Sequence, residues 1–238
     1  MDNPGYTTLA RQSGLLRDMR GVAQNIANVG TTGYRSEQVV FSEFVSDLGA
    51  EAPSLSTANA SVRATDLSQG ALTMTNGTFD LAIEGEGFFL LGTAGGERLT
   101  RAGVFTPSPD GTLVAPDGAE LLDAGGAPVF VPPDARSIRI AGDGTMSADG
   151  NPVAQIGLWV PEDVTNMRRV EGTRFDPGGA PIPLENGQIL QGFLESSNVE
   201  VVQQLARMIE VQRAYELGQT FLDREDERIR STIRTTGQ

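Results

Sequence analysis

Helix-like spacing of apolar residues is confined to the two ends of this 238-residue chain. At the N-terminal end, a stripe suited to one face of a helix comprises Leu9, Leu16, Met19, Ala23 and Ile26. This spacing predicts a helix over about residues 5–28. Two internal glycines each lower the stability of such a helix by about 1 kcal/mol relative to Ala. We therefore expect a helix that needs a packing partner.

The longer helical pattern covers about residues 199–233. It has heptad-like spacing with polar interruptions over more than three heptads, through Val201, Leu205, Met208, Tyr215 and Leu222, with Ile209 beside the stripe. Ser196, Ser197 or Asn198 can cap this helix. Two apolar stripes at opposite ends of one chain predict that the terminal helices pair as a coiled coil.

The stretch between the helices is rich in strand and turn signals. Asn76-Gly77 separates two apolar runs and predicts a strand–turn–strand unit. The run over residues 88–91 suits a buried strand, and four Asp-Gly pairs predict tight turns: Asp110-Gly111, Asp117-Gly118, Asp143-Gly144 and Asp149-Gly150. No helix-length segment intervenes, so a parallel βαβ sheet is not expected.

These patterns predict an α+β chain with an all-β domain inserted between paired terminal helices. We expect residues 1–30 and 197–238 to form the helical coiled-coil core. Residues 31–70 are expected to be an extended, Gly-rich linker, with residues 34–44 open to a strand pair or a short helix. Residues 71–196 are expected to form the β domain.

Composition excludes several classes of function. The chain has no Cys and no His, which rules out disulfides, thiolate metal sites and Ser-His-Asp or Cys-His catalysis. Its formal net charge of −13 argues against nucleic acid as a partner. No apolar run approaches the roughly 20 residues that cross a bilayer. The first residues lack the basic and apolar regions of a cleavable signal peptide.

Two further chemistries are weighed against simpler structural interpretations. Glu84 and Glu86 place two carboxylates on a Gly-rich turn, an arrangement open to a paired-carboxylate hydrolase. A tight acidic turn before a buried strand explains them more simply. The Asp-Gly pairs raise the option of calcium, but none has the spacing of an EF-hand loop. We therefore expect no catalytic residue, cofactor or metal.

Three motifs, taken together and in this order, resemble bacterial flagellar rod and hook proteins. The first is Asn25-Ile-Ala-Asn-Val-Gly-Thr-Thr-Gly33-Tyr34. The second comprises residues 80–89 and 99–105 in the middle of the chain. The third is Gln191-Gly-Phe-Leu-Glu-Ser-Ser-Asn198-Val199, followed by residues 208–216. The sequence departs from the family pattern at Val22-Ala23-Gln24 and at Gly30.

The resemblance implies a structural subunit of the flagellar basal-body rod, the drive shaft that crosses the periplasm. The compact length favours a proximal rod subunit, with a distal rod subunit as the alternative. The resemblance also implies export by the flagellar type III apparatus without signal cleavage, and partners among copies of itself and other rod subunits. Termini of family members are disordered before assembly and then form an inner helical layer. A secreted β-rich binding or carbohydrate-acting protein is the rival from another class.

The expected assembly interface combines the helix stripes with the two terminal motifs. Asn25, Asn28 and Gly33 are expected to shape a turn and satisfy neighbouring backbone groups. The full set of candidate interface residues is Leu16, Met19, Asn25, Ile26, Asn28, Gly33, Tyr34, Asn198, Leu205, Ile209, Arg213 and Tyr215.

Overall fold

The computed structural model describes residues 3–46 and 55–236, with side chains described for residues 8–39 and 64–235. The chain forms two compact units. The helical unit contains Met1–Asn28, Ser36–Asp66 and Val199–Gln238, and the β unit contains Val29–Arg35 and Leu67–Asn198. The chain therefore passes between the units four times.

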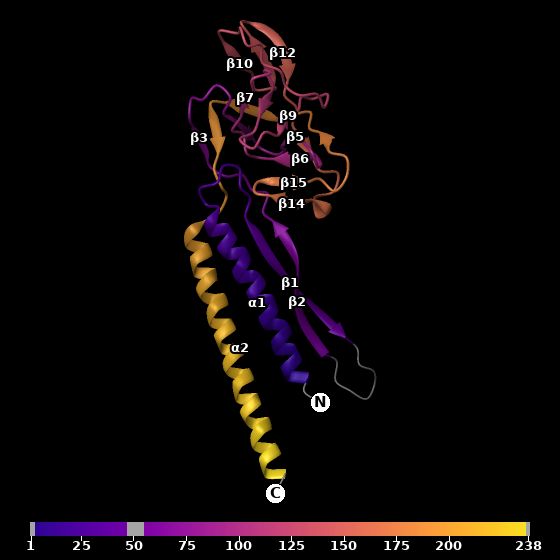
Figure 1. The fold of residues 1–238 in the computed structure, drawn as a ribbon, viewed down its shortest axis with the longest axis vertical. Helices are drawn as coiled ribbons and strands as arrows, with labels where there is room; N and C mark the ends of the chain where they lie inside the picture. Colours follow the sequence, from indigo (N-terminus) through magenta and orange to yellow (C-terminus); the bar gives the residue numbers. More distant parts are fainter. Residues whose placement is uncertain (1–2, 47–54, 237–238) are drawn as a thin grey trace. The chain divides into compact units, whose positions relative to one another are not determined.

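Two long helices dominate the helical unit. Helix α1 spans Asn3–Ala27 and helix α2 spans Val201–Thr236, which confirms the two helices expected from periodicity. They lie side by side and run in opposite directions (Figure 1). Asn25 contacts Gln204 near the end of α1, and Asp18, seven residues earlier in α1, contacts Arg207, three residues later in α2. Helix α2 begins at Val201, so the residue directly before it is Glu200 rather than Ser196, Ser197 or Asn198.

The face that α2 turns inward differs in part from the expected stripe. The most buried side chain in α2 is Val211, and the positions less exposed than their neighbours follow heptad spacing: Gln204, Met208, Val211, Tyr215, Gly218 and Leu222. Val201 and Leu205, which were assigned to this stripe, are exposed. The inward faces of both helices include polar residues with partners inside the unit, and a search for apolar periodicity overlooks such positions.

An antiparallel hairpin replaces the expected linker beside α1. Strand β1 (Glu37–Ser46) pairs with β2 (Leu55–Thr65), with a register irregularity between Val40 and Phe41. Residues 47–54 of the expected linker lie outside the described residues. The small and polar residues of β2 lack the apolar content that marks a strand in a sequence. Backbone pairing with β1 and contact with α1 stabilise this strand in place of apolar side chains of its own.

Antiparallel sheets build the β unit, as expected. The largest sheet has seven strands in the order β14-β15-β6-β5-β9-β8-β7, and the other sheets have two or three strands. The described strands of this unit are β3 (Leu72–Met74), β4 (Leu81–Glu84), β5 (Phe89–Thr93), β6 (Gly96–Thr100), β7 (Thr106–Pro107), β8 (Leu113–Val114), β9 (Glu120–Leu121), β10 (Ile138–Ile140), β11 (Thr145–Ala148), β12 (Asn151–Gln155), β13 (Trp159–Val160), β14 (Arg168–Glu171), β15 (Arg174–Asp176), β16 (Ile182–Pro183), β17 (Gln188–Gln191) and β18 (Phe193–Glu195), with a 3-10 turn at Val164–Asn166.

The Asp-Gly pairs occupy turns between consecutive strands. Gly111, Gly118, Gly144 and Gly150 all have positive φ, which confirms the turn predictions. At the β11–β12 turn Asp149 also has positive φ, at 49°. Positive φ at both central residues is the requirement of a two-residue type I′ hairpin.

The hairpin predicted at Asn76-Gly77 does not form. Strand β3 pairs with β18 and strand β4 pairs with β17. Asn76 has a φ of 60°, but Gly77 is not among the glycines with positive φ, so the pair does not form a type I′ turn. Instead, the backbone N–H groups of Thr75 and Asn76 both donate to the carbonyl of Gly192, which brings the chain beside a strand more than 100 residues later.

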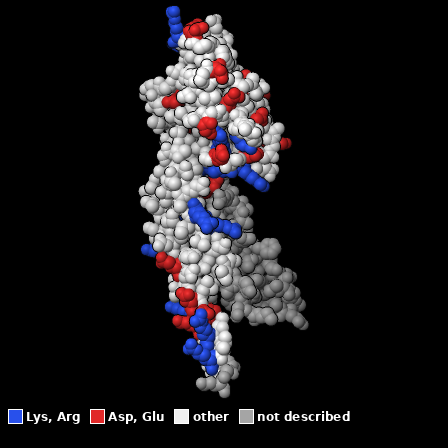
Figure 2. Space-filling view, in the orientation of Figure 1, with Lys and Arg blue, Asp and Glu red and all other residues white. Residues whose placement is uncertain are grey.

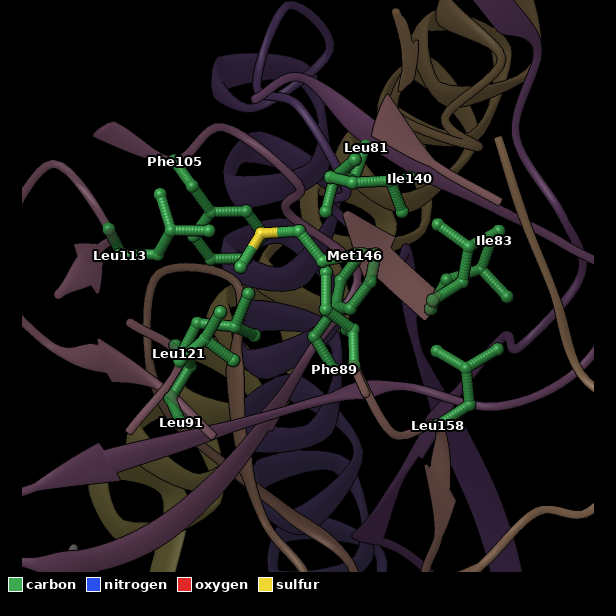
Figure 3. Packing of buried hydrophobic residues seen from close by; sticks show 14 of the residues in the cluster. Leu81, Ile83, Phe89, Leu91, Phe105, Leu113, Leu121, Ile140, Met146 and Leu158 are labelled. Carbon is green, nitrogen blue, oxygen red and sulfur yellow. The ribbon is translucent and has the colours of Figure 1, made fainter. Parts of the chain in front are cut away.

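Two apolar clusters fill the β unit, and the larger one surrounds Met146. Met146 is fully buried and lies among side chains from several strands, including Leu81, Phe89, Phe105 and Leu121 (Figure 3). Phe89 and Phe105 meet edge to face, with ring centroids 5.5 Å apart. The short strands thus gain their stability from a shared core rather than from their own length.

Met146→Ala should lower the free energy of unfolding of the β unit by about 2–5 kcal/mol, because it leaves a cavity in a closely packed core. Met74→Ala is the matched control, since the Met74 side chain is exposed. It should change that free energy by less than about 0.5 kcal/mol. Denaturant unfolding followed by Trp159 fluorescence measures both. Equal losses in the two variants would contradict this packing.

Candidate functional site

A buried carboxylate in the β unit joins segments that are distant in the sequence. Glu195 is fully buried, and its Oε1 accepts from Arg35 Nη2 at 2.6 Å and from the Gly70 backbone N–H at 2.8 Å. Its Oε2 accepts from Arg101 Nη1 at 3.2 Å. We call Glu195, Arg35 and Arg101 the ionic junction.

The ionic junction places two guanidinium groups around one carboxylate. Burial lowers the pKa of Arg101 to about 10, while the negative charge of Glu195 acts in the opposite direction. Arg101 therefore stays charged at neutral pH. Its Nη2 also donates to the carbonyl of Gly85 at 2.6 Å. Charge-assisted hydrogen bonds of this kind are strong, and loss of Glu195 would leave both guanidinium groups buried without a counter-charge.

Backbone contacts bring the first motif beside the last one. The Gly33 N–H donates to the carbonyl of Glu195 at 2.7 Å, and the Asn198 N–H donates to the carbonyl of Tyr34 at 3.3 Å. The Asn198 side chain donates to the carbonyl of Ser68 at 3.1 Å. Residues 33–34 and residues 195–198 are thus held together within the β unit.

Gly33 is required here for two reasons. Its φ is 69°, in the left-handed region that favours glycine. A Cβ at this position would lie 2.3 Å from the Ala102 backbone nitrogen. Any side chain at residue 33 must therefore displace the backbone that follows Arg101.

Arg169 completes the β-unit site. Its guanidinium carbon lies 4.5 Å from the ring centroid of Tyr34 and 4.7 Å from that of Phe175. It donates to the carbonyls of Arg35 and Gly172. Cation–π contact with buried rings adds to these hydrogen bonds. No spacing marks Arg169 in the sequence, because Tyr34 is more than 100 residues away.

In the helical unit, Asn25 joins segments that are distant in the sequence. Its side-chain amide donates to the carbonyl of Glu37 at 2.8 Å and accepts from the Glu37 N–H at 3.0 Å, as a neighbouring strand would. The same amide donates to Gln204 Oε1 at 3.2 Å. Asp18 and Arg207 add an ion pair of 2.8 Å between α1 and α2. Asn25 thus links both helices and the hairpin.

The twelve candidate interface residues separate into three groups. Asn25, Gly33 and Tyr34 are buried, and Asn198 is half-buried, each with partners inside its own unit. Outward-facing candidates on the helices are Leu16, Leu205, Ile209 and Arg213, with the three apolar ones 38%, 49% and 51% exposed. Half-buried helical candidates are Met19, Ile26, Asn28 and Tyr215.

The structure gives the acidic turn a structural role. Glu84 and Glu86 are both exposed, and the Gly85 carbonyl between them is the acceptor for Arg101. Across the described residues, no group of three His, Cys, Asp or Glu side chains is arranged to hold a metal ion. Neither α1 nor α2, in the part that the structure describes, is long and apolar enough to span a membrane.

Comparison with known proteins decides the family. Residues 190–235 match the family described as flagellar basal body rod FlgEFG protein C-terminal, and residues 82–148 match the flagellar hook protein FlgE/F/G D1 domain. The flagellar basal-body rod protein FlgF of Caulobacter vibrioides is 37% identical, over 100% of this chain and 99% of the relative. The chain belongs to the flagellar basal-body rod protein family.

Other relatives are also flagellar basal-body rod proteins. FlgF of Mesorhizobium japonicum is 34% identical over 91% of this chain and 90% of the relative. FlgG of Bacillus subtilis is 29% identical over 89% of this chain and 90% of the relative. This rod protein is therefore more similar to these FlgF relatives than to FlgG, and it is a structural subunit.

Glu195→Gln should lower the free energy of unfolding of the β unit by about 3–5 kcal/mol, because Arg35 and Arg101 would remain buried without a counter-charge. Asp226→Asn is a matched control on the exposed surface of α2, where an ion pair with Arg230 is accessible to water. Denaturant unfolding should distinguish the two variants clearly. An unchanged stability in Glu195→Gln would contradict the ionic junction.

Gly33→Ala should destabilise the β unit by more than about 1 kcal/mol, because both the positive φ and the contact with Ala102 disfavour a side chain. Gly30→Ala is the control, since no atom lies within 4 Å of a Cβ at that position. Thermal unfolding of both variants measures the difference. Equal melting temperatures would show that residue 33 tolerates a side chain.

Proposed function

We propose that this rod protein is a subunit of the proximal rod, located in the periplasmic part of the flagellar basal body. There it assembles with copies of itself and with other proximal and distal rod subunits to transmit motor torque. We further propose that the flagellar type III apparatus exports it without signal cleavage. The greater similarity to FlgF than to FlgG supports the proximal position over the distal alternative.

The exposed apolar side chains of the helical unit carry this proposal. Leu16, Leu205 and Ile209 face water, although each would be more stable if buried. Apolar stripes on two adjacent helices mark a surface that neighbouring subunits cover. The terminal helices then form a coiled-coil inner layer of the rod once several subunits are present.

The buried contacts support a mechanical role for the β unit. The ionic junction, Gly33 and Asn198 hold several segments of the β unit together. Asn25 fixes the hairpin against α1 within the helical unit. Such contacts resist shear, because several hydrogen bonds must break together before a segment moves.

Ile209→Asp should abolish motility and remove the protein from isolated basal bodies while leaving the monomer folded, because the side chain is exposed in the monomer. Val164→Asp is the matched control, since Val164 is an exposed residue of the β unit. Swimming assays and immunoblots of purified basal bodies measure the effect. Normal rods containing Ile209→Asp would contradict assembly through α2.

The rival carbohydrate-acting function depends on Glu84 and Glu86. Replacing both with Gln should leave swimming unchanged if the protein is a rod subunit. A glycan hydrolysis assay of the unchanged chain, with the double variant as control, tests the rival. Hydrolysis that disappears with both carboxylates would favour an enzyme.

A further inference from the structure

A small hollow in the β unit has a buried hydrogen-bond donor in its wall. The hollow measures about 150 Å³, and its lining comes from the segments 155–159 and 183–189, together with Ala124 and Asp143. Trp159 belongs to this lining and is 9% exposed. Within the described structure, its indole Nε1 has no hydrogen-bond partner. We call this hollow the Trp159 hollow.

Gly157 fixes the position of the indole N–H. A Cβ at residue 157 would lie 2.9 Å from Nε1 of Trp159. The lack of a side chain at Gly157 therefore lets Nε1 approach the backbone of a residue that also lines the hollow. The N–H thus lies at the wall of the Trp159 hollow, at the border of the smaller apolar cluster to which the indole belongs.

The indole N–H can donate but cannot accept a hydrogen bond. A buried Trp usually finds an acceptor for this group, because a donor removed from water without a partner costs free energy. A ligand that places an acceptor in the Trp159 hollow would remove this cost. The first requirement on a ligand is therefore a hydrogen-bond acceptor.

The remaining lining adds two further requirements. Leu158 and Leu184 give the hollow an apolar part, whereas Asp143 and Glu185 are exposed carboxylates at its edge. The Thr145 N–H donates to Asp143 Oδ1 at 2.9 Å and holds the pKa of Asp143 below its ordinary value. Ionised carboxylates only accept hydrogen bonds. The ligand must therefore also present donors and a small apolar group.

Charge restricts the ligand to a neutral molecule. The chain has a formal net charge of −13, and acidic side chains are frequent on the visible face of the β unit (Figure 2). An anion would be repelled by this surface and by the two carboxylates of the hollow. An ammonium group would suit the carboxylates, but it has no acceptor for the indole N–H.

An acetamido group has all of these properties. Its carbonyl accepts, its N–H donates and its methyl group is apolar. A peptide chain contains the same amide, but it would bind by adding a strand to a free sheet edge. Trp159 already pairs with Phe88 on one side and with Pro183 on the other, and Pro183 has no N–H to offer. A sugar that carries an acetamido group needs no strand edge.

We propose that the Trp159 hollow binds the acetamido group of an N-acetylated amino sugar. The carbonyl accepts from Nε1 of Trp159, the methyl group lies against Leu158 and Leu184, and the amide N–H and the sugar hydroxyls donate to Asp143 and Glu185. The volume limits the contact to the end of one sugar. No bond of the sugar is cleaved. The proposal goes beyond the rod function and does not depend on it.

Trp159 is the only tryptophan of the chain, so its fluorescence reports directly on this hollow. The purified full chain is titrated with N-acetylglucosamine and, in parallel, with glucose and N-acetylalanine methylamide. N-acetylglucosamine should change the Trp159 emission in a saturable way. Glucose, which lacks the acetamido group, and N-acetylalanine methylamide, which lacks the sugar, should give no saturable change over the same concentrations.

Two variants identify the contacts. Glu185→Gln should weaken binding roughly 3-fold to 10-fold, since a charged acceptor is lost from an exposed position where folding is unaffected. Glu97→Gln is the matched control, because Glu97 is an exposed residue of the β unit outside the hollow, and it should bind as the unchanged chain does. Trp159→Phe keeps an aromatic ring and removes the N–H. Saturation-transfer NMR on the acetyl methyl protons should show weaker binding to this variant.

Other results would overturn the proposal. These are an emission that does not respond to N-acetylglucosamine, an equal response to glucose, or an equal loss of binding in Glu97→Gln and Glu185→Gln. Saturable binding of N-acetylalanine methylamide as tight as that of the sugar would assign the hollow to peptides instead. Each of these results concerns the free protein and leaves the rod function intact, whereas absence of the chain from basal bodies would refute the rod function alone.

Discussion

The carboxylate of Glu195 is the contact on which the described arrangement of chain segments depends. It binds two guanidinium groups and one backbone N–H in a site closed to water. Within the described structure, Nε and Nη1 of Arg35 and Nε of Arg101 have no hydrogen-bond partner. Each such group costs about 1–3 kcal/mol. We infer that the ionic junction is kept for the unique geometry it imposes more than for net stability.

Within its described residues, the helical unit has no closed apolar core of the kind that the β unit has around Met146. Its helices meet through a mixture of aliphatic and polar contacts, among them Val22, Val211 and the Asp18–Arg207 pair. Apolar side chains remain on its outer faces. A unit built in this way is only partly stabilised by its own contacts, and association with neighbours can supply the missing buried area. The β unit, with its closed core around Met146, has no such need.

Periodicity and turn chemistry predicted much of this fold, because local rules govern helices and tight turns. Helices α1 and α2 and the four Asp-Gly turns are of this kind. Strand pairing was less predictable. Asn76-Gly77 suggested a hairpin, but β3 and β4 pair with strands more than 100 residues later. Sequence patterns do not reveal strand β2, because small polar residues carry little strand signal.

The candidate site was predictable only where a motif marked it. Asn25, Gly33 and Asn198 belong to the terminal motifs, and the structure gives each of them buried or half-buried partners. Arg35 and Arg169 lie outside these motifs, and Arg101 lies in the motif over residues 99–105 but has no spacing that indicates its role. The partners of all three come from distant segments. Periodicity places Leu205 on the stripe that pairs with the other terminal helix, but the structure leaves it exposed. A stripe of apolar residues does not indicate whether a helix of the same chain or another protein covers it.

Amide hydrogen exchange of the free protein and of the protein in purified basal bodies tests the central claim most directly. We expect the amides of α1 and α2 to exchange rapidly in the free chain and slowly in the rod. The Gly33 and Gly70 amides, which donate to Glu195 in the β unit, should be protected in both states. Equal protection of the helices in both states, or protection of Gly33 and Gly70 that arises only in the rod, would contradict the account.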